Sequence, residues 1–337
     1  MHFKSVFLLP AIAIMLLSAC NNEEHNTVET QGRQVVVFFS PGGLGDQGYN
    51  DQIMRGVQRV HMHYPDASFM FYSPSELDQA KSMYEFMKEI SPNVPTLILM
   101  ASNEFADIAI QMHADMPDHH EILLFECAEQ PRFEGLDRIH VFDIDMYGAS
   151  YLAGVTAAAA TQDSVLVWLS NPRDDVIARA ASGFTAGYKS VLDREPAVRY
   201  FWEDWHGYMM SEQAYEQMAS VAPRYGYIFP VAGGTNMGIY RYLRENPDGP
   251  LVAGMDVDQS IYSTRVSGSV MKRIDVLLED LIGGWINGEE IPQHRTCGLN
   301  DGYSDWQLAD KYMEQLGKIV ESHRSEAVDE ELKHRQN

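Results

Sequence analysis

Short apolar runs alternate with amphipathic stretches along most of the 337-residue chain. The first five mostly apolar runs cover residues 34–40, 67–73, 95–101, 121–127 and 138–144. Continuous apolar runs of this length are typical of parallel strands that are buried on both faces. Apolar residues recur at helical spacing between the first four runs. The pattern predicts a βαβα series, which forms a parallel sheet with right-handed crossovers.

The alternation repeats in the second half of the chain, without internal sequence identity. Strand-like runs cover residues 164–170, 197–203, 225–234 and 251–257, and helical patterns cover 147–160, 183–193, 211–222 and 237–246. We interpret 269–288 as one long amphipathic helix, followed by an extended stretch and a last helix from about residue 305. The charged residues 321–337 are expected to form a frayed helix end. The pattern therefore predicts an α/β protein with two doubly wound, Rossmann-like lobes of similar size.

Three crossings between the lobes are expected, near residues 143–146, 266–269 and 288–292. Lobe 1 would then comprise residues 34–143 plus 269–290, and lobe 2 would comprise 146–268 plus 291–325. Three crossings make a hinge, and the carboxyl ends of both sheets can point into the cleft beside it. Such a cleft is a natural site for a small ligand.

The first twenty residues have the pattern of an export signal. Their apolar run, residues 6–17, is too short to cross a bilayer as a helix. It ends in LLSAC (16–20), which resembles the lipobox of bacterial lipoproteins; a plain secretory signal is the alternative. We expect a signal peptide over residues 1–19, a lipid at Cys20 that anchors the protein to a bilayer, and a solvated tether over 20–33.

Charge and cysteine content narrow the function further. The formal net charge is −23 and no basic cluster is present, so nucleic acid is not an expected partner. Cys127 and Cys297 lack C-x-x-C spacing, and two separate buried thiols are favoured over a disulfide. The histidines show no metal-ligand spacing. No nucleophile–base pair or oxyanion motif is visible, so we expect no catalysis, no metal and no cofactor.

The glycine-rich stretch GGLGDQGYND (42–51) carries the first candidate chemistry. Gly43, Gly45 and Gly48 fit G-x-G-x-x-G, which holds dinucleotide phosphates at a helix N-terminus. Asp46 inside the motif would repel phosphate, and no acidic residue stands at the end of the second strand. The alternative is that Asp46, Tyr49 and Asn50 meet a planar ligand, which Tyr49 would stack on. Asp46 could equally cap the helix.

The sequence GGLGDQGYNDQIMRG (42–56) resembles the G-G-x-x-D-x-S-F-N-x-x-x-x-x-G opening of the basic membrane protein family. These are PnrA-like lipoproteins, the nucleoside-binding receptors of ABC importers. Further matches follow in the family's order: YLAGVTAA (151–158), GFTAGYKS (183–190), FPVAGGTNMG (229–238), GMDVDQ (254–259), SVMKRID (269–275) and CGLNDG (297–302). The resemblance covers nearly all of the mature chain and implies the fold of type I periplasmic binding proteins.

The resemblance also implies roles for residues at matching positions. Two aromatic rings would stack on the base, an aspartate would hold the ribose hydroxyls, and a lysine would face the sugar. The residues so implied are Tyr49 and Trp202 for the base, with Asp46, Asn50 and Asp204 beside them, Asp256 and Lys272 for the sugar, and Gly233 and Gly234 for close backbone approach. An ion pair between Asp256 and Lys272 across the hinge is the structural alternative.

Departures from the family pattern leave the ligand open. Tyr49 stands where the family has phenylalanine, and it adds a hydroxyl to the pocket. The family's DKS is replaced by DQG (46–48) in this chain, and Asn236 replaces a glycine of the family. We interpret the chain as an exported, lipid-anchored, monomeric binding protein for ABC-type uptake, with a purine nucleoside as the favoured ligand. It would contact the importer's membrane subunits. An exported dinucleotide-binding enzyme and a sugar-binding receptor remain alternatives.

Overall fold

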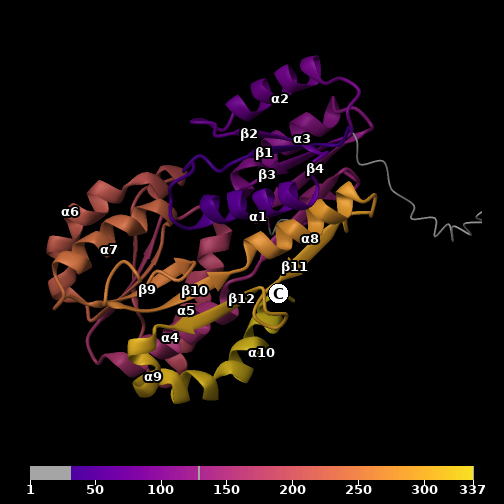
Figure 1. Cartoon of the computed structure of the whole chain (residues 1–337). Coiled ribbons are helices and arrows are strands. Elements are labelled where there is room, and N and C mark those ends of the chain that lie inside the picture. Colours follow the sequence, from indigo (N-terminus) through magenta and orange to yellow (C-terminus); the bar gives the residue numbers. More distant parts are fainter. Residues whose placement is uncertain (1–31, 128–129, 337) are drawn as a thin grey trace, which may run out of the picture.

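Two six-stranded sheets, one in each lobe, form the framework of the protein (Figure 1). The computed structural model describes residues 32–127 and 130–336. The expected signal peptide, the expected lipidation site Cys20 and the tether up to residue 31 lie outside the described residues. Within the described part of the chain, no helix is long and apolar enough to cross a membrane.

Lobe 1 contains a sheet with the strand order β11-β5-β4-β3-β1-β2, in which all neighbours are parallel. Its strands are β1 (Gln34–Phe38), β2 (Ser68–Tyr72), β3 (Thr96–Met100), β4 (His120–Phe125), β5 (Ile139–Ile144) and β11 (His294–Cys297). Helices α1 (Tyr49–His63) and α8 (Ile274–Ile286) cover one face of the sheet. Helices α2 (Gln79–Ile90) and α3 (Ala106–Ala114) cover the other face. The inner strands are buried because both faces are covered.

Lobe 2 contains a sheet with the order β12-β10-β9-β8-β6-β7, parallel except for β12. Its strands are β6 (Val165–Leu169), β7 (Ala197–Tyr200), β8 (Tyr227–Val231), β9 (Leu251–Asp256), β10 (Val266–Lys272) and β12 (Ser304–Leu308). Helices α4 (Tyr147–Ala160), α5 (Asp175–Val191), α9 (Asp310–Ser322) and α10 (Arg324–His334) cover one face. Helices α6 (Ser211–Val221) and α7 (Asn236–Glu245) cover the other.

The winding order is the same in the two lobes. β1 lies between β2 and β3, and β6 lies between β7 and β8, so each sheet reverses direction at these strands. This reversal is the topological switch point of a doubly wound sheet, next to which ligands bind. The predicted fold class, two doubly wound lobes joined by a hinge, is confirmed.

The boundaries of the lobes differ from the expected ones at two places. Residues 269–272 belong to β10 in the sheet of lobe 2, and residues 294–297 belong to β11 in the sheet of lobe 1. β10 escaped the sequence pattern because Ser267, Gly268 and Ser269 interrupt its apolar residues. They are nevertheless buried, and Ser267 Oγ lies 2.8 Å from Tyr227 Oη. The helix therefore begins at Ile274, and the chain crosses between lobes after β5, after β10 and after β11.

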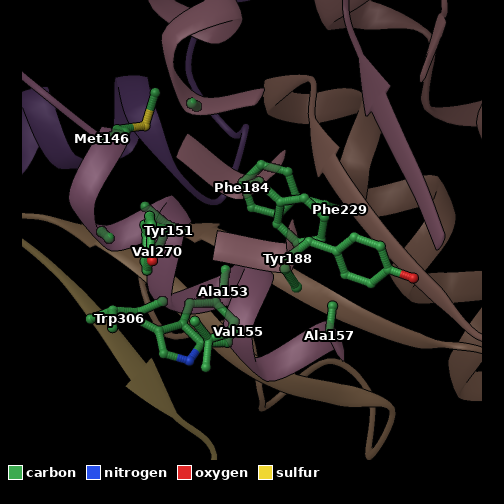
Figure 2. Packing of buried hydrophobic residues seen from close by; sticks show 14 of the residues in the cluster. Met146, Tyr151, Ala153, Val155, Ala157, Phe184, Tyr188, Phe229, Val270 and Trp306 are labelled. Carbon is green, nitrogen blue, oxygen red and sulfur yellow. The ribbon is translucent and has the colours of Figure 1, made fainter. Parts of the chain in front are cut away.

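The core of lobe 2 depends on close contact between α4 and α5 (Figure 2). A Cβ atom at Gly154 would lie 2.0 Å from the carbonyl oxygen of Phe184, and one at Gly187 would lie 1.9 Å from that of Tyr151. The two backbones can approach only because glycine stands at these positions. Phe184 then stacks on Phe229 of β8, with 4.3 Å between the ring centroids.

The C-terminal helix α10 packs on the hinge, so the prediction of a frayed end is wrong. The Glu331 side chain is fully buried and accepts hydrogen bonds from the backbone N–H groups of Gly148 and Leu299. Arg335 donates from Nε to the carboxylate of Asp145, over 3.2 Å. These contacts tie the first and third crossings to one helix. The sequence pattern missed them because the residues that make them are charged.

The two remaining cysteines are both buried as thiols. Cys127 follows β4, and Cys297 ends β11 in the same lobe. The expectation of two separate buried thiols is confirmed. Burial raises the pKa of Cys297 above its ordinary value, which keeps this thiol protonated at neutral pH.

Candidate functional site

A cavity of about 730 Å³, partly open to solvent, lies between the lobes. Its walls are the loops and strand ends at the carboxyl edges of both sheets, where open α/β sheets bind ligands. The predicted site residues that line this cavity are Asp46, Tyr49, Asn50, Gly233, Gly234, Asp256 and Lys272.

The glycine-rich loop is closed by its own carboxylates. Asp46 accepts hydrogen bonds from the backbone N–H groups of Gly48 (3.0 Å), Asn50 (2.7 Å) and Asp51 (3.3 Å). Asp51 accepts one from the N–H of Gly45, over 2.8 Å. A phosphate needs such N–H groups at a helix N-terminus. Because carboxylates already occupy them, the loop geometry argues against a dinucleotide site, and Asp46 acts as the cap of α1.

Asn50 holds the loop after β1 in place from the first turn of α1. Its Oδ1 accepts from the backbone N–H of Ser40 (3.0 Å), and its Nδ2 donates to Ser40 Oγ (2.9 Å). The residue is 2 % exposed. Asn50 thus shapes the wall of the cavity, while much of its hydrogen-bonding capacity is used within the loop.

Tyr49 begins α1 and lines the cavity. The ring stacks on Phe125 at the end of β4, with centroids 5.6 Å apart and planes 13° from parallel. The ammonium nitrogen of Lys272 lies 5.5 Å from the ring centroid. The hydroxyl is buried without a hydrogen-bond partner among the described residues. Burial raises its pKa well above the ordinary tyrosine value.

Asp256 ends β9 with a left-handed backbone conformation, φ 68°. Such a conformation is costly for a residue other than glycine and is often found at ligand sites. None of the described residues donates a hydrogen bond to its carboxylate. Burial, followed by repulsion from Asp46, raises the pKa of this carboxyl to about 7. A ligand that donates hydrogen bonds would supply the missing partners.

Lys272 ends β10 and forms an ion pair with Glu126, directly after β4 in the other lobe. The structural alternative of a pair with Asp256 is therefore wrong, because the ammonium group reaches lobe 1. Burial lowers the pKa of Lys272 to about 7. Lys272 is buried and Glu126 is partly buried, and the pair joins the two lobes at the cavity wall.

The sequence analysis missed Glu126. It occupies the position in lobe 1 that Asp256 occupies in lobe 2, since β4 and β9 hold the same place in their sheets. Both acids have left-handed backbones, with φ 58° for Glu126. An acidic residue at the carboxyl end of the fourth strand of each lobe was the signal in the sequence that could have identified Glu126.

Trp202 and Asp204 do not lie where the sequence placed them. Trp202 is 52 % exposed and does not line the cavity. Trp205 and Tyr208, in the short helix η3 (Trp205–Met209), line it instead. Asp204 caps that helix by accepting from the N–H of His206 (3.0 Å), and it lines an adjoining pocket. The chain turns after β7, so the aromatic residues that reach the cavity come a few positions later.

Glu104 and Asp174 close the cavity near Tyr208. Asp174 accepts from Tyr208 Oη (2.6 Å) and, across the lobes, from Asn103 Nδ2 (3.1 Å). Burial and the neighbouring Asp174 raise the pKa of Glu104 to about 8. The described residues lining the cavity include five carboxyl groups and one lysine, and the raised pKa values leave Glu104 mostly neutral and Asp256 partly neutral at pH 7. Such a wall repels anions and favours a neutral ligand rich in hydrogen-bond donors.

The lobes also touch beside the cavity. Gln52 donates from Nε2 to the backbone oxygen of Asp256 (2.7 Å). Gln47 accepts from Gln259 Nε2 (3.1 Å) and from Tyr262 Oη (2.8 Å). The structure is thus a closed arrangement of the two lobes. In the described ranges, no cluster of three or more His, Cys, Asp or Glu side chains could hold a metal ion.

Two doubly wound lobes closed on a cavity of this kind define a ligand-binding protein of the type I periplasmic class. The chain belongs to the Bmp family, described as ABC transporter substrate-binding protein PnrA-like, whose family model matches residues 33–335. This confirms the resemblance to the basic membrane protein family. The protein is accordingly an extracytoplasmic substrate-binding component of an ABC transporter and not an enzyme.

Individual relatives agree with this membership. The chain is 23 % identical over 287 residues to Basic membrane protein C of Borreliella burgdorferi, covering 81 % of this chain and 79 % of that protein. A solute-binding protein of an ABC transporter system from Aeropyrum pernix K1 is similar in structure, with a TM-score of 0.68, 18 % identity and 90 % of each chain covered. A periplasmic solute-binding protein from Actinobacillus succinogenes 130z with bound D-allose has a TM-score of 0.61 and 16 % identity, covering 85 % of this chain and 99 % of that one.

Proposed function

We propose that this protein captures a purine nucleoside in the cavity between its lobes and presents it to the membrane subunits of an ABC importer. The observation that carries the proposal is the unpartnered, buried carboxylate of Asp256 in a cavity that also exposes aromatic side chains. One carboxylate can accept hydrogen bonds from two neighbouring hydroxyls, as a ribose offers them. Lys272 would donate to the same hydroxyls.

The base would lie against aromatic side chains at the other end of the cavity. Trp205 takes the role first given to Trp202, because it lines the cavity and Trp202 does not. Tyr49 would contact the ligand from lobe 1. Base–aromatic stacking contributes about 1–3 kcal/mol per base in nucleic-acid complexes, which is enough to favour a nucleoside over its free sugar.

The charge of the cavity favours a nucleoside over a nucleotide. Five lining carboxyl groups face one lysine, and that lysine is already paired with Glu126. Glu104 is mostly neutral at pH 7 because its pKa is raised to about 8, so the repulsion comes from the other carboxylates. A phosphate would therefore meet repulsion without a free cation to offset it. The same argument counts against a dinucleotide.

A sugar is the second candidate ligand. A buried carboxylate can accept hydrogen bonds from the hydroxyls of a free sugar as well as from those of a nucleoside's ribose. A solved structure of similar fold holds D-allose. A free sugar has no base, so Trp205 and Glu104 would line the cavity without contacting one. The two candidates therefore differ in whether binding depends on a base.

The location of the protein at the membrane and its importer partner belong to the same proposal. A lipid at Cys20 would hold the monomeric protein at the membrane beside its importer. Replacing Cys20 with alanine should move the protein to the soluble fraction with its fold intact, as circular dichroism would verify. An unchanged membrane fraction would contradict the anchor.

Isothermal titration calorimetry with inosine, inosine 5′-monophosphate, NAD, D-ribose and D-allose tests the ligand. We expect inosine to bind at least tenfold more tightly than its monophosphate, because the phosphate meets the acidic wall. It should also bind at least tenfold more tightly than either sugar, because the sugars lack a base. Tighter binding of NAD or of a sugar would refute the proposal.

A further inference from the structure

The hydroxyl of Tyr49 has no structural role among the described residues. It is buried, yet no described residue hydrogen-bonds to it. The ring itself is fully engaged in packing, since it stacks on Phe125 and lies near the Lys272 ammonium. A phenylalanine would make the same ring contacts. An unpaired buried hydroxyl weakens the fold, so packing alone does not account for tyrosine here.

The surroundings of this hydroxyl belong to the cavity. After burial, the groups that raise its pKa most are Glu104, Asp256 and Tyr208, all of which line the cavity. Glu104 comes from lobe 1, whereas Asp256 and Tyr208 come from lobe 2. Tyr49 lines the cavity together with these three residues, so a ligand bound there would lie beside it.

We infer that the Tyr49 hydroxyl donates a hydrogen bond to a sugar hydroxyl of the ligand and thereby determines specificity. This inference rests on the proposed function. Tyr49 would add to its ring a directed polar contact that a phenylalanine cannot make.

The ligand group must be able to accept and donate at once. Tyr49 offers a donor, whereas the nearby carboxylate of Asp256 offers acceptors when it is ionised. A carbonyl oxygen would satisfy Tyr49 but would be repelled by the carboxylate. A sugar hydroxyl satisfies both, because it accepts from Tyr49 through its oxygen and donates its proton to Asp256.

The variant Tyr49→Phe isolates this contact because it keeps the ring. Calorimetry would compare wild type and Tyr49→Phe with inosine and with its 2′-, 3′- and 5′-deoxy analogues. We expect Tyr49→Phe to weaken inosine binding about tenfold. For the one analogue that lacks the contacted hydroxyl, wild type and variant should bind equally.

Thermal unfolding without ligand supplies the matched control. Tyr49→Phe should unfold at the same temperature as wild type or a higher one, because it removes an unpaired polar group. Tyr227→Phe should unfold at a lower temperature with inosine affinity unchanged, since it loses the hydroxyl that lies 2.8 Å from Ser267 Oγ.

The outcomes separate this inference from the proposed function. If wild type binds nucleosides and Tyr49→Phe binds each of the four ligands as tightly as wild type does, the inference is refuted and the proposed function stands. If only sugars bind, the proposed function fails, and D-ribose with its deoxy forms then tests the hydroxyl contact in the same way. A wild type that binds neither class refutes both.

Discussion

Replacing Asp256 with asparagine tests whether its carboxylate binds the hydroxyls of a ribose. Asparagine tolerates left-handed backbone conformations, so it suits the φ of 68° at this position better than alanine does. The substitution keeps the shape of the side chain and removes one acceptor oxygen together with the charge. The change therefore affects the recognition of hydroxyls and leaves the strand end in place.

The expected magnitude follows from the energy of charged hydrogen bonds. Such bonds contribute about 1.5–3 kcal/mol each, which corresponds to roughly ten- to hundredfold in affinity. Wild type should therefore bind inosine at least tenfold more tightly than 2′-deoxyinosine at pH 8. Asp256→Asn should lose most of this preference, because its amide offers only one acceptor.

The pH dependence gives an independent check. The pKa of Asp256 is raised to about 7 in the ligand-free protein, and ribose hydroxyls require the ionised form. Inosine should therefore bind about tenfold more weakly at pH 6 than at pH 8, releasing a proton at the lower pH. The ratio of inosine to deoxyinosine affinity should fall with pH in wild type and stay constant in Asp256→Asn.

Calorimetry in two buffers of different ionisation enthalpy measures both the affinities and the protons released. Equal wild-type affinities for inosine and 2′-deoxyinosine at pH 8 would refute the assignment of Asp256 to the ribose. So would a preference that survives Asp256→Asn.

Three further changes separate the cavity from its surroundings. Trp205→Ala should weaken nucleoside binding roughly ten- to hundredfold by loss of stacking. Trp202→Ala, at an exposed position, should change the affinity measured by the same calorimetric titration less than twofold. Glu331→Ala should lower the melting temperature by several degrees in calorimetry, because two buried N–H groups lose their acceptor; an unchanged melting point would show that α10 does not brace the hinge. The folded state binds the Asp256 proton more tightly than the unfolded state (pKa about 7 against 3.8), so this residue makes the free energy of unfolding fall as pH rises from about 4 to 7. Urea titrations without ligand should show a steeper fall for wild type than for Asp256→Asn, and parallel curves would contradict the raised pKa.

The sequence predicted most strands because they are buried on both faces and therefore read as continuous apolar runs. β10 was hidden by small polar residues, which are buried because they pack closely and hydrogen-bond, not because they are apolar. β11 was expected only as part of an extended stretch and not as a strand of lobe 1, because it is a four-residue edge strand of mostly polar residues. Burial by tertiary contact, as at Glu331 in α10, leaves no local pattern to read.

The candidate site was predictable where position in a motif determines geometry. Asp46 and Asp256 lie at strand or helix ends that motifs identify, and both line the cavity. Trp205 was missed because the turn after β7 decides which aromatic ring faces inward, and a sequence does not specify that turn. Glu126 was missed because its ion pair with Lys272 joins residues far apart in the chain.

Mass spectrometry of the small molecules released from the protein, after purification from its native cells and denaturation, tests the central claim most directly. A closed binding protein often retains its ligand, and the account predicts a purine nucleoside in amounts comparable to the protein. Recovery of a sugar or a dinucleotide in that amount would contradict it.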